Sequence, residues 1–235
     1  MRSIRAKFIL LTLSAIIAAL SVATYIGVYS IKTLGKSDAD QMLHLKCTTG
    51  AMNLETYFDD VERSVETVAT LVQDNLETMP DGQFVNEVEN VRHLFSKIAH
   101  NTNGVLTYYF RVDPEFSKEH SGFWYVKQSG REFQEHEVTD ISQYDTNDTS
   151  TLVWFTIPKA EKKGVWLPPY HTENFGARVI SYNVPVYRHG QFVGVVGIEI
   201  DYGTLVSEVE KIKLFENGYA FILDEHSNVI YHPQL

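Results

Sequence analysis

One uninterrupted apolar run, residues 8–29, limits most strongly what this chain can fold into. As an α-helix, a run of about 22 residues extends roughly 33 Å, which is enough to cross a hydrocarbon core of about 30 Å. A helix of that length without a charged residue is rare in the core of a soluble protein. The run therefore predicts a transmembrane helix near the N-terminus.

The charges around this run predict its orientation. Arg2, Arg5 and Lys7 precede it, whereas all 30 acidic residues and the other 17 basic residues follow Lys7, a net charge of −13. Basic residues close to a span stay in the cytoplasm, so we expect a cytoplasmic N-terminus over 1–7 and an extracytoplasmic remainder. The acidic balance argues against nucleic acid or an anionic bilayer surface as a partner. A cleaved signal peptide stays an alternative, although the run is longer than the usual apolar region of about 7–15 residues.

A long helical pattern follows, with Ser37 as its predicted N-cap and Pro80 ending it after Met79. Apolar residues alternate in steps of four and three along one face. They are Cys47, Ala51, Leu54, Phe58, Val61, Val65, Val68 and Val72. Such a narrow face suits either a partner helix in a homodimer or a sheet of the same domain, and the sequence leaves both open.

The rest of the chain alternates helical and strand-like segments separated by turn residues. His189-Gly190 joins two strand-like runs and marks the clearest hairpin, whose strands we expect in the interior of a sheet. Residues 139–151 are polar and read as a surface loop. The predicted elements are helices over 84–98 and 202–213 and strands over 105–112, 123–127, 178–187, 192–200, 219–223 and 229–232.

Several short motifs, in this order and spacing, resemble the extracytoplasmic double Cache (dCache) sensor family. The matching stretches are WF at 154–155, VWLPPY at 165–170, VISYNVPVY at 179–187, GVVGIEID at 194–201, GYAFILD at 218–224 and YHP at 231–233. Together with the anchor and the long helix, the resemblance covers nearly the whole chain.

The resemblance implies an α+β fold: a transmembrane helix runs into a long stalk helix packed on a PAS-like antiparallel sheet, and a second Cache module begins after it. The implied boundaries are 1–7 for the cytoplasmic N-terminus, 8–29 for the transmembrane helix, 30–80 for the stalk, 81–201 for the membrane-distal module and 202–235 for the start of a truncated membrane-proximal module. A complete relative would continue to a cytoplasmic output domain, for which we expect a diguanylate cyclase first and a histidine kinase or chemoreceptor stalk next.

The resemblance also implies a small-molecule site. In amino-acid-binding members, a Trp-Tyr pair, an arginine just upstream, a Pro-Tyr-x-Asp segment and an acid near the end of the last strand bind the ligand. Carried over by position, these become the pair Trp154 and Phe155, then Tyr170 and Glu199. Trp166 adds another large aromatic residue to the same region.

Three departures from the family pattern affect the expected ligand. Leu152 stands where the arginine is expected, Phe155 lacks a hydroxyl group, and Thr172 replaces the aspartate. Because an arginine fork is the usual partner of a ligand carboxylate, an amine or a small neutral molecule is easier to accommodate than an amino acid. Lys159 could supply the missing cation. An amino-acid-like ligand then becomes possible.

The residues also fit other functions. The aromatic residues could instead be core and loop anchors in a membrane-tethered scaffold or adhesion domain that has no ligand site. The sequence shows no zinc-binding His-Glu-x-x-His and no serine-hydrolase elbow. We therefore predict no catalytic residue, metal ligand or cofactor within these residues, and a hydrolase is the least favoured reading.

Overall fold

The N-terminal apolar run and the predicted stalk form one continuous helix, α1 (Ile4–Thr78), in the computed structural model, which describes residues 4–80, 82–127, 132–172, 176–213, 218–224 and 227–235. The predicted N-cap at Ser37 is therefore wrong. Between the apolar run and Ser37 the only strong helix breaker is Gly35, and one glycine inside a helix costs only about 1 kcal/mol. The helix passes through Ser37, which has no helix end to cap.

The chain divides into two compact units, Met1–Thr49 and Gly50–Leu235. In the first unit, α1 contains the one stretch in the described part of the chain that is long and apolar enough to cross a membrane, and its most apolar window is not buried by the protein at all. A signal sequence near an N-terminus meets the same criterion. An apolar surface of this size needs an apolar environment.

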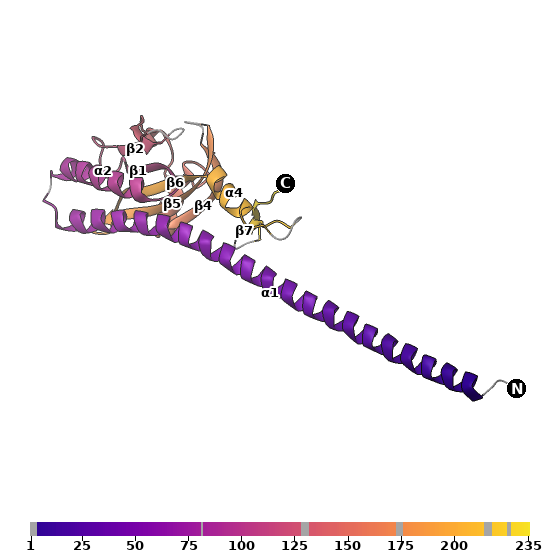
Figure 1. Cartoon of the computed structure of the whole chain (residues 1–235). Helices are drawn as coiled ribbons and strands as arrows, with labels where there is room; N and C mark the ends of the chain where they lie inside the picture. Colours follow the sequence, from indigo (N-terminus) through magenta and orange to yellow (C-terminus); the bar gives the residue numbers. More distant parts are fainter. Residues whose placement is uncertain (1–3, 81, 128–131, 173–175, 214–217, 225–226) are drawn as a thin grey trace. The chain divides into compact units, whose positions relative to one another are not determined.

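The second unit is built on a six-stranded antiparallel sheet with the strand order β3-β2-β1-β6-β5-β4. The strand of this sheet that comes last in the sequence, β6, lies in its centre beside the first, β1. Figure 1 shows this sheet next to α2 and the C-terminal part of α1. The strands are β1 (Val105–Val112), β2 (Gly122–Val126), β3 (Gln134–Glu135), β4 (Val165–Thr172), β5 (Ala177–Arg188) and β6 (Gln191–Asp201).

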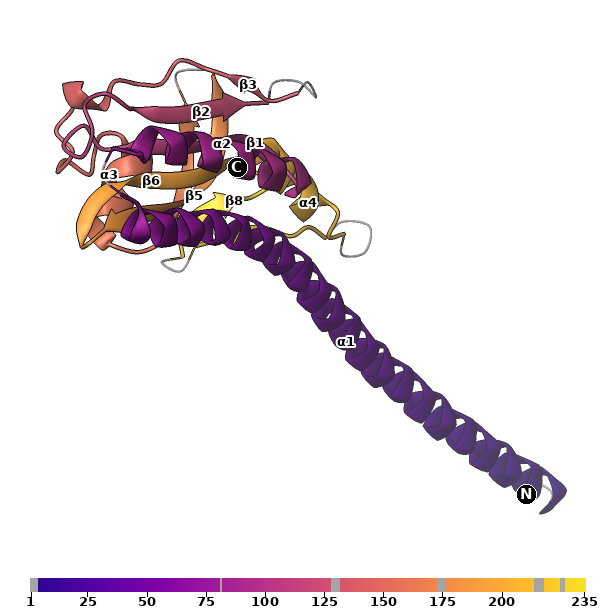
Figure 2. The same ribbon diagram turned by 90° about the vertical axis from the view of Figure 1, so that its left-hand side faces the viewer.

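One face of the sheet packs against α2 (Phe84–Asn101) and the C-terminal half of α1, as Figure 2 shows from a second direction. The apolar face predicted on the stalk accounts for this packing, because Val61, Val65, Val68 and Val72 are fully buried there. Cys47 is exposed. The part of the face from Val61 to Val72 therefore packs on its own domain. A homodimer through the stalk helix stays a prediction.

The predicted hairpin is confirmed, with β5 and β6 both interior strands of the sheet. His189 and Gly190 have φ values of 48° and 80°, and a two-residue turn with positive φ at both positions matches the twist of the strands it joins. After β6, Asp201 caps α4 (Tyr202–Glu210) by accepting a hydrogen bond from the Thr204 amide.

The C-terminal hairpin is also present, as β7 (Ile222–Leu223) and β8 (Val229–Tyr231). It belongs to the compact unit that begins at Gly50. Tyr202 of α4 donates a hydrogen bond to the Ile230 carbonyl, which attaches the hairpin to the start of α4. The boundary expected at residue 202, between a first and a second module, stays a prediction.

Two short helices were not predicted. The polar loop contains a single 3₁₀ turn, η1 (Ile141–Gln143), capped by the Asp140 side chain. Directly after the loop comes α3 (Val153–Glu161), which contains Pro158. Proline is unfavourable inside a helix, and aromatic residues have only moderate helix propensity, so the local sequence gave little indication of α3.

The contact between α2 and the sheet gives a stability prediction. Phe95 is fully buried, with its ring centroid 5.1 Å from that of Tyr108 on β1. Replacing it with alanine (Phe95→Ala) should lower the free energy of unfolding by about 3–5 kcal/mol, because it removes apolar contacts and leaves a cavity. Chemical denaturation of the purified chain in detergent measures this loss.

The matched control is Val85→Ala on the same helix, where the side chain is 45% exposed. It should change the unfolding free energy by less than about 1 kcal/mol, as is usual for surface positions. Equal effects of the two substitutions would contradict the packing described for α2.

Candidate ligand-binding site

The second face of the sheet carries polar side chains, although it too is buried. Side chains alternate between the faces of a strand, so Tyr108, Phe110 and Val112 of β1 contact the helices. The intervening residues of β1, namely Thr107, Tyr109 and Arg111, point to the other side and are 0, 3 and 3% exposed. Ser181 and Asn183 of β5 and Glu199 of β6 lie on the same face and are equally buried.

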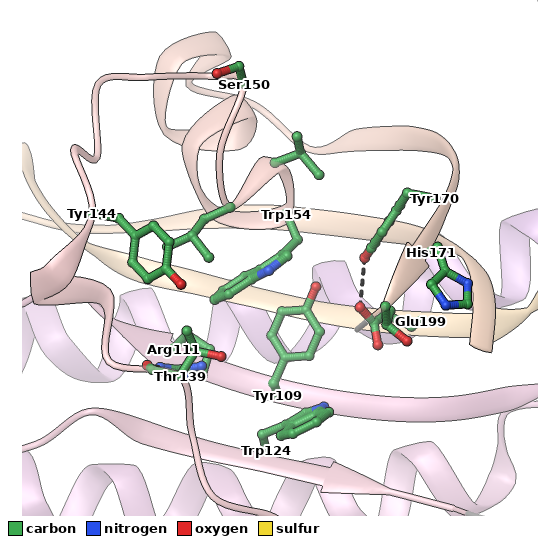
Figure 3. Close-up of a pocket in the computed structure, with 13 residues that line it drawn as sticks. Tyr109, Arg111, Trp124, Thr139, Tyr144, Ser150, Trp154, Tyr170, His171 and Glu199 are labelled. Atoms are coloured by element: carbon green, nitrogen blue, oxygen red, sulfur yellow. Dashed lines mark hydrogen bonds between the residues drawn. The ribbon is translucent and has the colours of Figure 1, made fainter. Parts of the chain in front are cut away.

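A cavity of about 400 Å³ lies over this face. Its floor comes from β1, β2 and β6, and its walls come from β4, α3 and the loop before α3 (Figure 3). Large aromatic side chains and a few polar groups line it, as is typical of small-molecule sites. The lining residues are Tyr109, Arg111, Trp124, Thr139, Tyr144, Ser150, Leu152, Val153, Trp154, Tyr170, His171, Thr172 and Glu199.

Glu199 forms the acidic end of the cavity. Thr107 donates a hydrogen bond to its Oε2 atom and Tyr170 donates one to its Oε1 atom, both at 2.6 Å. Burial raises the pKa of the Glu199 carboxyl, and these two hydrogen bonds act in the opposite direction by stabilising the charged form. A carboxylate has about four acceptor positions, so Glu199 can accept further hydrogen bonds from a ligand.

Tyr109 occupies the middle of the floor. Its hydroxyl group donates a hydrogen bond to Asn183 Oδ1, and Asn183 in turn donates one to Ser181 Oγ at 2.8 Å. Gly197 of β6 makes room for this arrangement, because a Cβ atom there would lie 2.6 Å from the Tyr109 ring. The hydroxyl and amide groups thereby satisfy one another, as buried polar groups must.

Arg111 forms the basic end. Its Nε donates to the Ser121 carbonyl at 3.2 Å and its Nη2 donates to the Thr139 carbonyl, while the guanidinium carbon lies 5.4 Å from the centre of the Trp154 ring. Burial lowers the pKa of Arg111 to about 10, so it stays charged at neutral pH. Within the described residues this buried cation has no carboxylate in an ion pair.

The wall above Arg111 is held by an ion pair outside the cavity. Lys159 of α3 contacts Asp113 Oδ2 at 3.0 Å and Thr146 Oγ1 at 2.8 Å, which joins α3 to the end of β1 and to the loop. The Asp113 side chain is only 2% exposed, and its charge is balanced by Lys159. At the start of α3, Leu152 has a φ of 42°, a left-handed conformation that is unusual for a residue other than glycine.

Three of the predicted site residues meet in this cavity, and three do not. Trp154, Tyr170 and Glu199 all line it. Phe155 is instead fully buried between α3 and the sheet, against Ile141 and Val195.

Trp166 lies on the opposite face of the sheet. Its ring packs on Phe58 of α1 with centroids 4.9 Å apart, and its Nε1 donates a hydrogen bond to Glu62 at 2.6 Å. Lys159 is occupied by Asp113. It is not among the residues that line the cavity, so its role as the cation of the site stays a prediction.

Sequence reasoning missed the residues that β1 and β2 contribute, above all Tyr109, Arg111 and Trp124. A signal was available: a strand that is strongly apolar at alternate positions carries Thr, Tyr and Arg at the positions between them. A charged residue within a strand that is apolar at alternate positions indicates either a buried pair or a site. In the described part of the chain, no cluster of three or more His, Cys, Asp or Glu side chains could hold a metal ion.

Solved structures share this fold at low sequence identity. The extracellular domain of mmHK1S-Z3, described as a histidine kinase, matches 75% of this chain and 65% of its own with 19% identity and a TM-score of 0.56. The ligand-binding domain of the Pseudomonas aeruginosa amino-acid chemoreceptor PctC, in complex with GABA, matches 83% and 77% with 19% identity and a TM-score of 0.56. The sensory domain of the Campylobacter jejuni chemoreceptor Tlp3 matches 84% and 72% with 18% identity and a TM-score of 0.54.

This chain thus spans 65% of the first of these structures and somewhat more of the other two. The family model dCache_1, described as Cache domain, matches residues 30–235. That match includes α1 beyond the apolar run, the six-stranded sheet and the C-terminal hairpin. The chain therefore belongs to the Cache domain family dCache_1.

Proposed function

We propose that this chain is the extracytoplasmic sensing region of a membrane-bound receptor and that it binds a small organic carboxylate in the cavity over β1 and β6. The observation that carries the proposal is Arg111, a buried guanidinium group at the end of an aromatic cavity. A buried charge without an ion pair is unfavourable, and a ligand carboxylate would relieve that cost. The guanidinium fork also suits a carboxylate geometrically.

This proposal revises the ligand expected from sequence. The amine or neutral molecule was favoured because Leu152 occupies the position of the family's arginine. Arg111 supplies a cation from β1 instead, and it lies beside Trp154, the aromatic residue that the family pattern did locate. The ligands named for PctC and Tlp3 relatives, GABA, L-norvaline, isoleucine and L-valine, all carry a carboxylate, which supports the revision.

The apolar part of α1 supports the membrane anchor, and the basic residues before it support a cytoplasmic N-terminus. The reported relatives are a protein described as a histidine kinase and chemoreceptors. They favour these two output classes over the diguanylate cyclase that was expected first. The cavity itself argues against the alternative of a scaffold without a ligand site.

A thermal-shift screen of the full chain in detergent tests the sensing function. Carboxylates, α-amino acids, ω-amino acids, amines and uncharged polyols would be compared as classes. We expect only carboxylate-bearing compounds to raise the melting temperature, because only they can pair with Arg111. A ligand at 100 times its Kd stabilises the folded state by about 2.7 kcal/mol, which is enough to detect. Stabilisation by amines alone would contradict the role of Arg111, and no stabilisation by any class would favour the scaffold.

Replacing Arg111 should weaken binding of whichever carboxylate the screen identifies. Hydrogen bonds to charged groups contribute about 1.5–3 kcal/mol, so Arg111→Met should raise the Kd by about 10- to 100-fold in isothermal titration calorimetry. Arg111→Lys keeps the charge but loses the fork and should give a smaller loss.

Arg92→Lys is the matched control. Arg92 lies on α2, is paired with Glu135 on β3 and does not line the cavity, so its substitution should leave the Kd unchanged. Circular dichroism of each variant would show whether the fold is kept. Equal losses in Arg111 and Arg92 variants would mean that the effect is on folding and not on the ligand.

The raised pKa of Glu199 predicts how stability depends on pH. The Glu199 carboxyl binds its proton more tightly in the folded chain than in the unfolded chain. Its contribution to the free energy of unfolding is therefore fully present below the unfolded pKa of about 4.3, and it is lost as the pH rises through the folded pKa. Glu199→Gln removes the titration. The melting temperature of the variant minus that of the unsubstituted chain should therefore increase as the pH rises from about 4 to about 7.

Glu137→Gln, at an exposed glutamate outside the cavity, is the control. Its melting temperature should follow that of the unsubstituted chain over the same pH range. If Glu199→Gln also follows the unsubstituted chain, Glu199 is not a buried acid with a raised pKa.

A further inference from the structure

The register of the sheet separates the two charged ends of the cavity by a known number of residues. On the β1–β6 ladder Thr107 lies opposite Glu199, and Arg111 lies opposite Val195, with no register shift between these pairs. Glu199 and Arg111 are thus four residues apart along the strands. At about 3.4 Å per residue, their Cα atoms are separated by about 14 Å along the strand direction.

The two charged groups do not meet one another across this distance. Figure 3 shows Arg111 and Glu199 on opposite sides of Tyr109. Arg111 donates only to the carbonyls of Ser121 and Thr139, and Glu199 accepts only from Thr107 and Tyr170, among the hydrogen bonds of the described residues. Both groups therefore keep capacity for a ligand, a guanidinium having five donors and a carboxylate about four acceptor positions.

An α-amino acid carries its carboxylate and ammonium groups on one carbon atom, so it cannot reach both ends of such a cavity. The Cα spacing is that of the register, and Tyr109 lies between the two charged side chains in Figure 3. A ligand that contacts both Arg111 and Glu199 must therefore carry its own charged groups several carbon atoms apart.

We infer that the ligand is an elongated dipolar molecule of the linear ω-amino acid class, with its carboxylate on Arg111 and its ammonium group on Glu199. This inference rests on the proposed sensing function and specifies its ligand. The methylene chain would lie along Tyr109 and Trp154, whose ring centroids are 5.4 Å apart in an edge-on arrangement. The hydroxyl groups of Thr107 and Tyr170 hold the Glu199 carboxylate in place for the ammonium group.

The test is a chain-length series on the full chain in detergent by isothermal titration calorimetry. γ-Aminobutyrate, δ-aminovalerate and ε-aminocaproate would be compared with valerate, n-pentylamine and L-norvaline. We expect an optimum among the ω-amino acids and a Kd for the best of them about tenfold or more below those of valerate and norvaline, because only the ω-amino acid makes both charged contacts.

A variant then assigns the ammonium contact. In Glu199→Gln the ratio of the Kd of valerate to that of the best ω-amino acid should fall to about one. Because this comparison uses two ligands on one protein, a general loss of folded protein would affect both equally. Tyr170→Phe, which removes one hydrogen bond to Glu199, should reduce the same advantage by a smaller factor.

The outcomes separate the inference from the function on which it rests. If norvaline or valerate binds through Arg111 as tightly as every ω-amino acid, the inference is wrong and the carboxylate-sensing function stands. If the advantage of the ω-amino acid survives in Glu199→Gln, the ammonium group binds elsewhere and the inference is equally wrong. Absence of binding by the whole series, valerate included, overturns both.

Discussion

The structure depends on a sheet that is covered on both faces. Alternate side chains of β1, β5 and β6 point to opposite sides, and neither side is open water. One set is apolar and packs on α1 and α2. The other set includes buried polar side chains, and each of these polar groups needs a partner inside the protein. Tyr109, Asn183 and Ser181 satisfy one another. Arg111 and Glu199 carry the remaining charges, one at each end of the cavity.

The same strands connect the cavity to α1. On β4, Tyr170 donates to Glu199 in the cavity, while Trp166 donates from the other face to Glu62 of α1. On β5, Ser181 accepts a hydrogen bond from Tyr170, and the neighbouring Tyr182 donates to Glu66, one helical turn further along α1, at 2.7 Å. These contacts to α1 are hydrogen bonds with carboxylates, which are more directional than the apolar packing around them. Displacement of β4 or β5 therefore changes specific contacts with α1.

Much of this fold could be predicted from the sequence, because its elements follow strong local patterns. β1 has the predicted bounds, and the hairpin turn at His189-Gly190 needed only the chemistry of positive φ. α3 was missed because Pro158 and the aromatic pair before it are weak helix formers, and the sheet below holds the segment through Phe155. The packing of the stalk on its own sheet could not be predicted, since its apolar face fits a sheet and a partner helix equally well.

The candidate site could also be predicted only in part, because only some of its residues belong to local sequence motifs. Trp154, Tyr170 and Glu199 belong to the short motifs through which the sequence resembles the dCache family, so they could be found, and all three line the cavity. Arg111 could be recognised only as a charge in an otherwise apolar strand. Its place in the cavity could not be predicted, because its position relative to Glu199 is set by the pairing of β1 with β6, two strands about 90 residues apart in the chain, and that pairing has no local signature. For this reason Leu152, in the position of the family's arginine, indicated that the site lacks a cation. The cavity has a cation, Arg111, on β1. Because Arg111 and Glu199 both belong to the sheet, their spacing is set by the register of β1 and β6 and not by the position of α3. That spacing makes the length of a ligand, as well as its charges, a property the cavity can select.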